Sequence, residues 1–138
     1  MFGKMRKNMI MAIFILFLVG CGASYSVDTG VEPTEMLVLD GDFEFSETIE
    51  KGEVIALDMR LPIKSGYVII GASFDPEILK LEHYIEYTGD EEPRARYMFT
   101  ALADGMSDVL VKMQPKGGGD VEVFKRISIN IGEKNSLF

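Results

Sequence analysis

The sequence predicts an all-β fold: an immunoglobulin-like antiparallel β-sandwich of seven to eight strands that follows an N-terminal signal and lipidation segment. Three observations predict this fold. Short runs of alternating apolar and polar residues recur about every ten residues, turn signals separate them, and no amphipathic helical period appears after residue 34. About one hundred residues remain for the domain, which suffices for one hydrophobic core.

The first 20 residues have the architecture of a signal peptide. Lys4, Arg6 and Lys7 form a positive n-region, and an uncharged apolar run of 11 residues follows over 9–19. This run is too short for a membrane-spanning helix, which needs roughly 20 apolar residues. We therefore expect residues 1–20 to be removed.

Cys21 is the only cysteine of the chain, so it has no disulfide partner there. The motif Leu18-Val19-Gly20-Cys21 resembles the lipobox of bacterial lipoproteins. The resemblance implies that Cys21 receives a diacylglycerol, becomes the new N-terminus and is acylated again. Two or more acyl chains hold a protein stably on a membrane. We expect a tether over 21–34 and a domain over 35–138, lipid-anchored in the bacterial cell envelope outside the cytoplasm.

Charge narrows the range of partners. Removal of the signal segment takes away three of the 14 basic residues and no acid, which leaves 11 positive against 22 negative charges, a net charge of −11. So acidic a surface argues against nucleic acid as a partner and against electrostatic docking on anionic lipid.

Four strands are predicted before residue 71, each as a short apolar or alternating run: 36–39, 43–46, 54–60 and 67–70. The first ends at the turn signal Asp40-Gly41-Asp42. The third places Ile55, Leu57 and Met59 on one face. The fourth is rich in β-branched residues and predicts a strand buried on both faces.

Four more strands are predicted by the same criteria: 79–84, 97–101, 109–113 and 127–131. The last places Ile127, Ile129 and Ile131 on one face. Loops are expected at 61–66, 88–93 and 114–120. The antibody-type disulfide and tryptophan are absent, which places the domain in the broader immunoglobulin-like group.

No residue pattern predicts an enzyme, a metal or a cofactor. The single histidine, His83, has no neighbouring ligands and is expected on a strand face near a sheet edge. The acids around Asp40-Gly41-Asp42 alternate as in calcium loops but lack the glycine at position six and the acid at position twelve, so we interpret them as solvated turn residues. Gly117-Gly118-Gly119 precedes a strand rather than a helix, which disfavours a phosphate cradle.

The loop before Tyr67 offers a different feature. In Lys64-Ser65-Gly66-Tyr67, the glycine permits a positive φ and a close approach of a partner's backbone. The tyrosine can pack its ring and form a hydrogen bond through its hydroxyl. On these residues alone, a plain strand connection is the simpler interpretation.

Residues 52–131 resemble the chagasin family of cysteine-peptidase inhibitors. The resembling segments lie in the family's order: Lys51-Gly52-Glu53-Val54, Ser65-Gly66-Tyr67, 73–81, 99–105 and Gln114-Pro115. The central loop keeps Gly-Tyr but has Lys64 and Ser65 in place of Thr-Thr. The second loop carries three acids where the family has glycines, and Gln114 and Lys116 replace an arginine and an aromatic residue.

The resemblance implies an immunoglobulin-like sandwich that inhibits papain-like cysteine peptidases reversibly and non-covalently. Three loops at one end would form a wedge, the first entering the cleft and the others gripping its walls. The implied inhibitory residues are Lys64, Ser65, Gly66 and Tyr67 in the first loop, Asp90, Glu91 and Glu92 in the second, and Gln114, Pro115 and Lys116 in the third. The alternative is a non-inhibitory immunoglobulin-like binding module that recognises another envelope protein.

Overall fold

The computed structural model describes residues 32–133, all of which belong to one unit of the chain. The signal segment, Cys21 and the tether up to residue 31 lie outside the described residues, so the expectations about them stay predictions. Among residues 32–133, no helix is long and apolar enough to cross a membrane.

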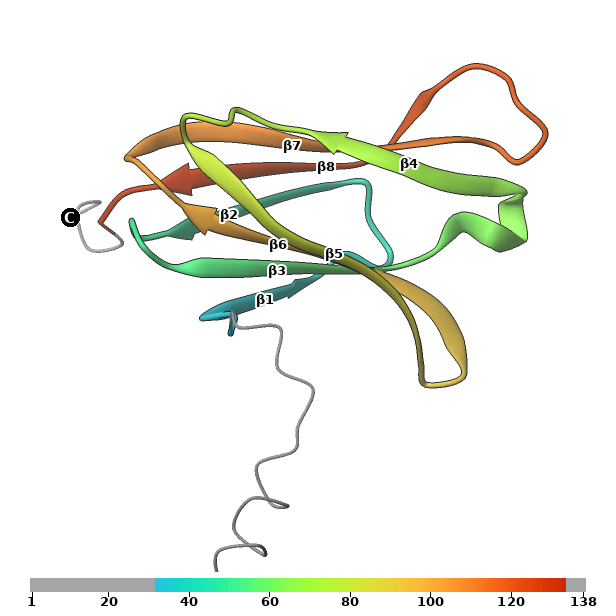
Figure 1. The fold of residues 1–138 in the computed structure, drawn as a ribbon, viewed down its shortest axis with the longest axis horizontal. Helices are drawn as coiled ribbons and strands as arrows, with labels where there is room; N and C mark the ends of the chain where they lie inside the picture. Colours follow the sequence, from blue (N-terminus) through green and yellow to red (C-terminus); the bar gives the residue numbers. More distant parts are fainter. Residues whose placement is uncertain (1–31, 134–138) are drawn as a thin grey trace, which may run out of the picture. The chain divides into compact units, whose positions relative to one another are not determined.

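Eight strands form two four-stranded sheets that pack face to face (Figure 1). Sheet A has the order β1-β3-β6-β5 and sheet B the order β2-β8-β7-β4. The elements are β1 Glu35–Val38, β2 Glu44–Ile49, β3 Val54–Arg60, the 3-10 helix η1 Pro62–Ser65, β4 Tyr67–Ser73, β5 Leu79–Gly89, β6 Glu92–Ala101, β7 Gly105–Pro115 and β8 Glu122–Ile131. The predicted β-sandwich is confirmed.

The sheets are mixed rather than wholly antiparallel, which corrects the expectation from the sequence. β1 pairs in parallel with β3, and β2 pairs in parallel with β8. The chain crosses to sheet B between β1 and β2, returns between β2 and β3, and reverses direction each time (Figure 1). Two reversals bring β3 beside β1 in the same direction, which a single hairpin cannot do.

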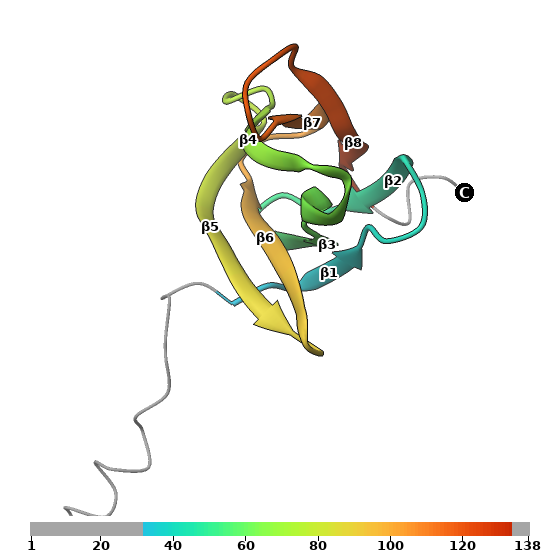
Figure 2. The same ribbon diagram turned by 90° about the vertical axis from the view of Figure 1, so that its right-hand side faces the viewer.

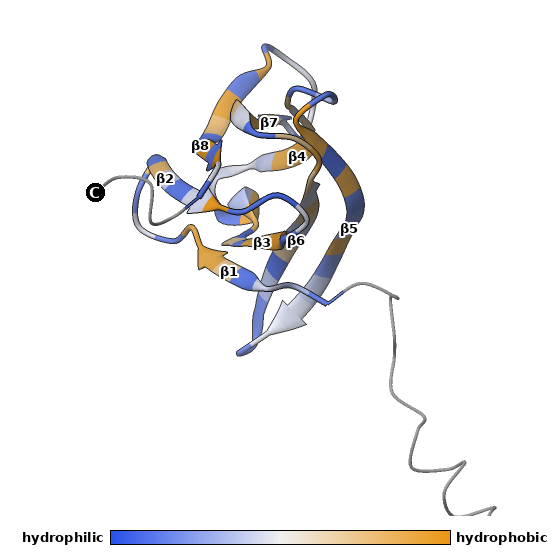
Figure 3. Ribbon diagram, turned by 90° about the vertical axis from the view of Figure 1, so that its left-hand side faces the viewer, coloured by the Kyte–Doolittle hydropathy of each residue, from blue (hydrophilic) through white to orange (hydrophobic). Residues whose placement is uncertain are grey.

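The core lies between the sheets and follows the predicted alternation. Orange and blue bands alternate along β5 and β8 in Figure 3, as expected for strands with one buried face. Ile55, Leu57 and Met59 are fully buried. Phe99 lies at the centre, with the Phe74 ring edge-on at a centroid distance of 5.0 Å. These inward faces hold the sandwich together through apolar burial.

β4 was expected to be buried on both faces, and this is wrong. Val68 and Ile70 are 39% and 47% exposed, whereas Ile69 and Ala72 pack against the core. The reason is position: β4 is the last strand of sheet B, so its apolar content covers only one side. A run of β-branched residues alone does not distinguish an edge strand from a central one.

Candidate functional site

Three connections gather at one end of the sandwich, which we call the loop end. They are η1 between β3 and β4, the turn between β5 and β6, and the loop over 116–121 between β7 and β8 (Figure 2). η1 lies between the other two. The structure thus brings together the three segments that the sequence singled out, in the arrangement that the resemblance implied.

The central connection is a short 3-10 turn with an exposed tip. Pro62 occupies the start of η1 and is buried, and its fixed φ favours this position. Lys64 and Ser65 are exposed. Ile63, which the sequence analysis did not include, is also exposed, at 49% of its surface. An apolar side chain therefore stands beside the predicted contact residues.

Gly66 ends this turn in the left-handed region, with φ 82° and ψ 19°. Its N–H donates to the carbonyl of Ile63 at 2.9 Å, as a C-terminal cap does. A Cβ at Gly66 would meet no atom within 4 Å, so a larger residue would be strained by its backbone dihedral and not by a clash. The positive φ expected from the sequence is confirmed.

The central and third connections are joined by hydrogen bonds. The N–H of Lys116 donates to the carbonyl of Gly66 at 2.9 Å. The Tyr67 hydroxyl donates to Glu122 Oε2 at 2.7 Å, and this hydrogen bond raises the pKa of Tyr67 above its ordinary value. The two segments are thereby held as one unit.

The third connection was expected over 114–120, but β7 continues to Pro115, so Gln114 and Pro115 lie on that strand. Of the three predicted residues, only Lys116 is exposed. Gln114 Nε2 donates to the carbonyl of Gly119 at 2.8 Å, across the loop. Pro115 lies opposite Tyr67 in the β4–β7 register. Gln114 and Pro115 therefore shape the loop, and Lys116 is the side chain it presents.

The second connection is a tight turn and not the loop over 88–93 expected from the sequence. β5 continues to Gly89 and β6 begins at Glu92, which leaves Asp90 and Glu91 as the two turn residues. Both have positive φ, 52° and 64°, the conformation of a type I′ hairpin turn. This turn matches the strand twist, which is why the hairpin continues to its tip.

The three predicted acids of this segment, two in the turn and one at the start of β6, have different environments. Asp90 and Glu91 are exposed at the tip. Glu92 Oε2 instead lies 3.0 Å from Arg60 Nε and 3.7 Å from Arg94 Nη1. Glu92 is therefore part of a polar network on the outer face of sheet A, and Asp90 and Glu91 are the acids available to a partner.

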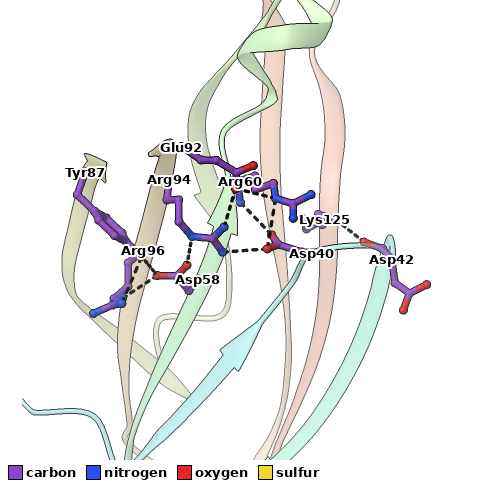
Figure 4. A network of polar contacts seen from close by, with 9 residues as sticks. All are labelled: Asp40, Asp42, Asp58, Arg60, Tyr87, Glu92, Arg94, Arg96 and Lys125. Atoms are coloured by element: carbon purple, nitrogen blue, oxygen red, sulfur yellow. Dashed lines mark hydrogen bonds and ion pairs between the residues drawn. The ribbon is translucent and has the colours of Figure 1, made fainter. Parts of the chain in front are cut away.

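That network centres on Asp58, which is only 3% exposed (Figure 4). Arg94 Nε donates to Asp58 Oδ1 at 2.7 Å and Arg96 Nε donates to Oδ2 at 2.9 Å. The Tyr87 hydroxyl donates to the same Oδ2. Burial alone would raise the pKa of Asp58, but these three hydrogen bonds outweigh it and hold the pKa below its usual value.

The turn Asp40-Gly41-Asp42 was expected to be solvated; Gly41 and Asp42 are exposed as expected, whereas Asp40 is half-buried and paired. Asp40 Oδ2 accepts a hydrogen bond from Arg94 Nη2 at 3.1 Å, and Asp40 Oδ1 accepts one from the N–H of Arg60 at 3.1 Å. Lys125 Nζ donates to the carbonyl of Asp42. The turn is anchored because the Asp40 carboxylate and the Asp42 carbonyl face cations that only the folded chain brings near.

Sequence reasoning missed this network. One signal was present: Asp58 is an acid within an otherwise apolar strand, and Arg94 and Arg96 alternate on the strand that pairs with it. A buried carboxylate requires such partners. The register that joins them depends on the tertiary fold.

His83 lies on β5, the edge strand of sheet A, as the sequence predicted. Its Nε2 is buried without a hydrogen-bond partner among residues 32–133. No cluster of three or more His, Cys, Asp or Glu placed to hold a metal ion occurs within that range. His83 pairs with Met98 of β6, away from the end of the hairpin at Gly89 and Glu92.

Comparison with known proteins identifies the fold. No family model and no curated protein sequence matches the chain. Among solved structures, the cysteine protease inhibitor EhICP2 from Entamoeba histolytica superposes with a TM-score of 0.57 and 12% identity, over 73% of this chain and 100% of that one. PbICP-C, solved in complex with falcipain-2, gives a TM-score of 0.50 and 15% identity, over 71% and 99%. At such low identity the likeness shows the fold alone, and the fold is chagasin-like.

Proposed function

We propose that the protein is a membrane-anchored, reversible inhibitor of papain-like cysteine peptidases that acts through its loop end. One observation carries the proposal: the exposed turn at Lys64 and Ser65 lies between two further connections, on a fold shared with cysteine protease inhibitors. The falcipain-2 complex of PbICP-C supports a papain-like peptidase as the kind of partner.

The geometry suggests how the central turn blocks a cleft without being cut. η1 is a 3-10 turn capped by Gly66, so its peptide bonds are coiled rather than extended. A nucleophile reacts only when the target carbonyl is held in a near-attack arrangement, which a coiled turn does not offer. Because the turn is already hydrogen-bonded, little conformational entropy is lost on binding.

The charges at the loop end favour some clefts over others. The tip of the β5–β6 turn presents Asp90 and Glu91, whereas Lys64 and Lys116 lie on the other two connections. Opposed charges across an interface speed association, and like charges reject partners. The preferred target has a basic wall facing Asp90 and Glu91 and acidic groups facing the two lysines.

Membrane anchoring is proposed through lipid on Cys21, supported by the lipobox-like motif. Expression in a bacterium with labelled fatty acid tests it. We expect the label on the wild-type chain, which should partition into the detergent phase. Cys21→Ser should carry no label and partition into the aqueous phase; label on the serine variant would contradict the proposal.

The inhibitor proposal is tested by titrating papain with a soluble form that begins at Ser24. We expect inhibition at submicromolar concentration, unless Gly66 is replaced by valine. Gly52→Val is the matched control, because Gly52 also has a positive φ, 89°, with no atom within 4 Å of its missing Cβ. Gly52 lies in the β2–β3 turn, away from the loop end.

Both glycine variants should lose similar stability from backbone strain, about 1–3 kcal/mol. Only Gly66→Val should lose inhibition. Equal inhibition by both variants would show that the central turn does not enter the cleft. No inhibition by a folded wild-type sample at high micromolar concentration would contradict papain-like inhibition.

A second candidate is a non-inhibitory binding module for another envelope protein. The observation that favours it is that the second and third connections offer few side chains to a peptidase cleft. The second is a two-residue turn, and in the third the Gln114 side chain is hydrogen-bonded to the loop's own backbone. Capture of a single envelope protein, abolished by charge reversal at Asp90 and Glu91, together with no effect on papain, would support this candidate.

A further inference from the structure

The β5–β6 hairpin extends past the strand that supports it. Pairing between β3 and β6 ends at Arg60 opposite Arg94, whereas β5 and β6 remain paired to Gly89 opposite Glu92. One backbone hydrogen bond, from the N–H of Leu61 to the carbonyl of Pro93 at 3.0 Å, continues the β3 side. A two-stranded extension is marginal on its own, so its orientation depends on side-chain contacts.

Those contacts come from the Asp58-centred network, which connects β3 with both strands of the hairpin. Asp58 on β3 binds Tyr87 of β5 and Arg94 and Arg96 of β6. The Arg96 guanidinium carbon also lies 5.3 Å from the centroid of the Tyr87 ring, within cation–π range. Both strands of the hairpin are thus fastened to one carboxylate.

Arg94 extends the network to the rest of the sandwich. Its guanidinium reaches Asp58 through Nε and Asp40 through Nη2, at 2.7 and 3.1 Å. Arg60, which directly precedes the central connection, contacts Glu92 at the hairpin end at 3.0 Å. A planar fork that bridges two carboxylates fixes orientation as well as distance, which a lysine cannot reproduce.

We propose that Asp58 is a positioning residue: with Arg94 it fixes the β5–β6 hairpin relative to η1, and so sets the spacing at which the turn acids and the central turn meet a partner. This inference rests on the proposed function for its consequence in binding. The positioning itself is a property of the free protein and is tested separately.

The test compares three variants of the full chain purified in mild detergent. Asp58→Asn keeps the shape of the side chain and removes its charge. Arg94→Lys keeps the positive charge and removes the planar guanidinium that bridges the two carboxylates. Asp108→Asn is the matched control, because Asp108 also accepts hydrogen bonds from an arginine and a hydroxyl, Arg126 at 3.0 Å and Ser128 at 2.9 Å, on sheet B. The measurements are amide hydrogen exchange of peptides over 87–94 and 125–131, and papain inhibition.

In Asp58→Asn we expect the amides over 87–94 to exchange about tenfold faster or more relative to those over 125–131, whose exchange should rise only as far as the lower global stability of the variant requires. Arg94→Lys should give a smaller change in the same peptide, and Asp108→Asn none there. Papain inhibition by Asp58→Asn should weaken about tenfold, through faster dissociation.

Unchanged exchange over 87–94 in Asp58→Asn would overturn the proposal. So would an equal loss of protection over 125–131, since that would make Asp58 a general stabilising residue. If the wild type does not inhibit papain, the proposed function fails, but the exchange measurement still decides whether Asp58 positions the hairpin. If hairpin exchange rises and inhibition stays at the wild-type level, positioning holds and its role in binding is rejected.

Discussion

Two parts of the loop end are built in different ways. The central and third connections are joined by the backbone bond between Lys116 and Gly66 and by the exposed Tyr67–Glu122 bond, whereas the β5–β6 hairpin is fastened by the buried charges around Asp58. Backbone hydrogen bonds do not titrate and tolerate many side chains. A buried ionic network depends on each of its members, because loss of one leaves another charge unpaired. The hairpin should therefore be the more sensitive part to mutation and to pH.

The largest expected effect is that of Asp58→Ala, which leaves the nearly buried Arg94 without its main partner. We expect a loss of about 3–5 kcal/mol in the free energy of unfolding, measured by denaturant titration. Asp108→Ala, which breaks an exposed pair, should cost far less than Asp58→Ala. Similar losses in both variants would remove the distinction between the two kinds of contact.

The pH dependence of the unfolding free energy distinguishes the contribution of the Asp58 charge from that of its side-chain packing. Because the folded-state pKa of Asp58 is lowered, its contribution is complete above the unfolded value of about 3.9 and is lost as the pH falls through the folded value. Wild type should therefore exceed Asp58→Asn by a constant amount from pH 7 to about 5, and by less at lower pH. A gap that stays constant down to pH 2 would contradict an ionised Asp58.

The backbone coupling of the other two connections is broken by Lys116→Pro, which removes the N–H that donates to Gly66. We expect a loss of about 0.5–1.5 kcal/mol, independent of pH between 4 and 8, in thermal or denaturant unfolding. Lys116→Ala keeps the N–H and should change stability little. If the alanine variant loses as much as the proline variant, the lysine side chain and not the backbone bond is responsible.

The smallest effect is expected at the exposed end of the network. Arg60→Ala removes an ion pair with Glu92 whose arginine is 61% exposed, and should cost about 0.2–1 kcal/mol. Because the pair is exposed, the loss should shrink when unfolding is repeated at about 1 M salt, whereas the loss in Asp58→Ala should persist. Equal salt sensitivity in the two variants would indicate that Asp58 is not shielded from solvent.

The sequence predicted most of the scaffold correctly because strand patterning is local. Alternation over 54–60 places Ile55, Leu57 and Met59 in the core without reference to any other strand. The three connections were also found locally, from glycines and polar residues between apolar runs. Their gathering at one end was implied by the resemblance and is visible in the fold (Figure 2).

The sequence by itself thus determined the strand content, the inward faces and the places where the chain turns. Only the tertiary structure decided the parallel pairing of β1 with β3 and of β2 with β8, the edge position of β4 and the network around Asp58. Asp58 and Arg94 are 36 residues apart and meet only because of the β3–β6 register. The physical reason is that the alternation of apolar and polar side chains along a strand depends only on neighbouring residues. Strand pairing and register are set by the packing of distant segments, which no local pattern encodes.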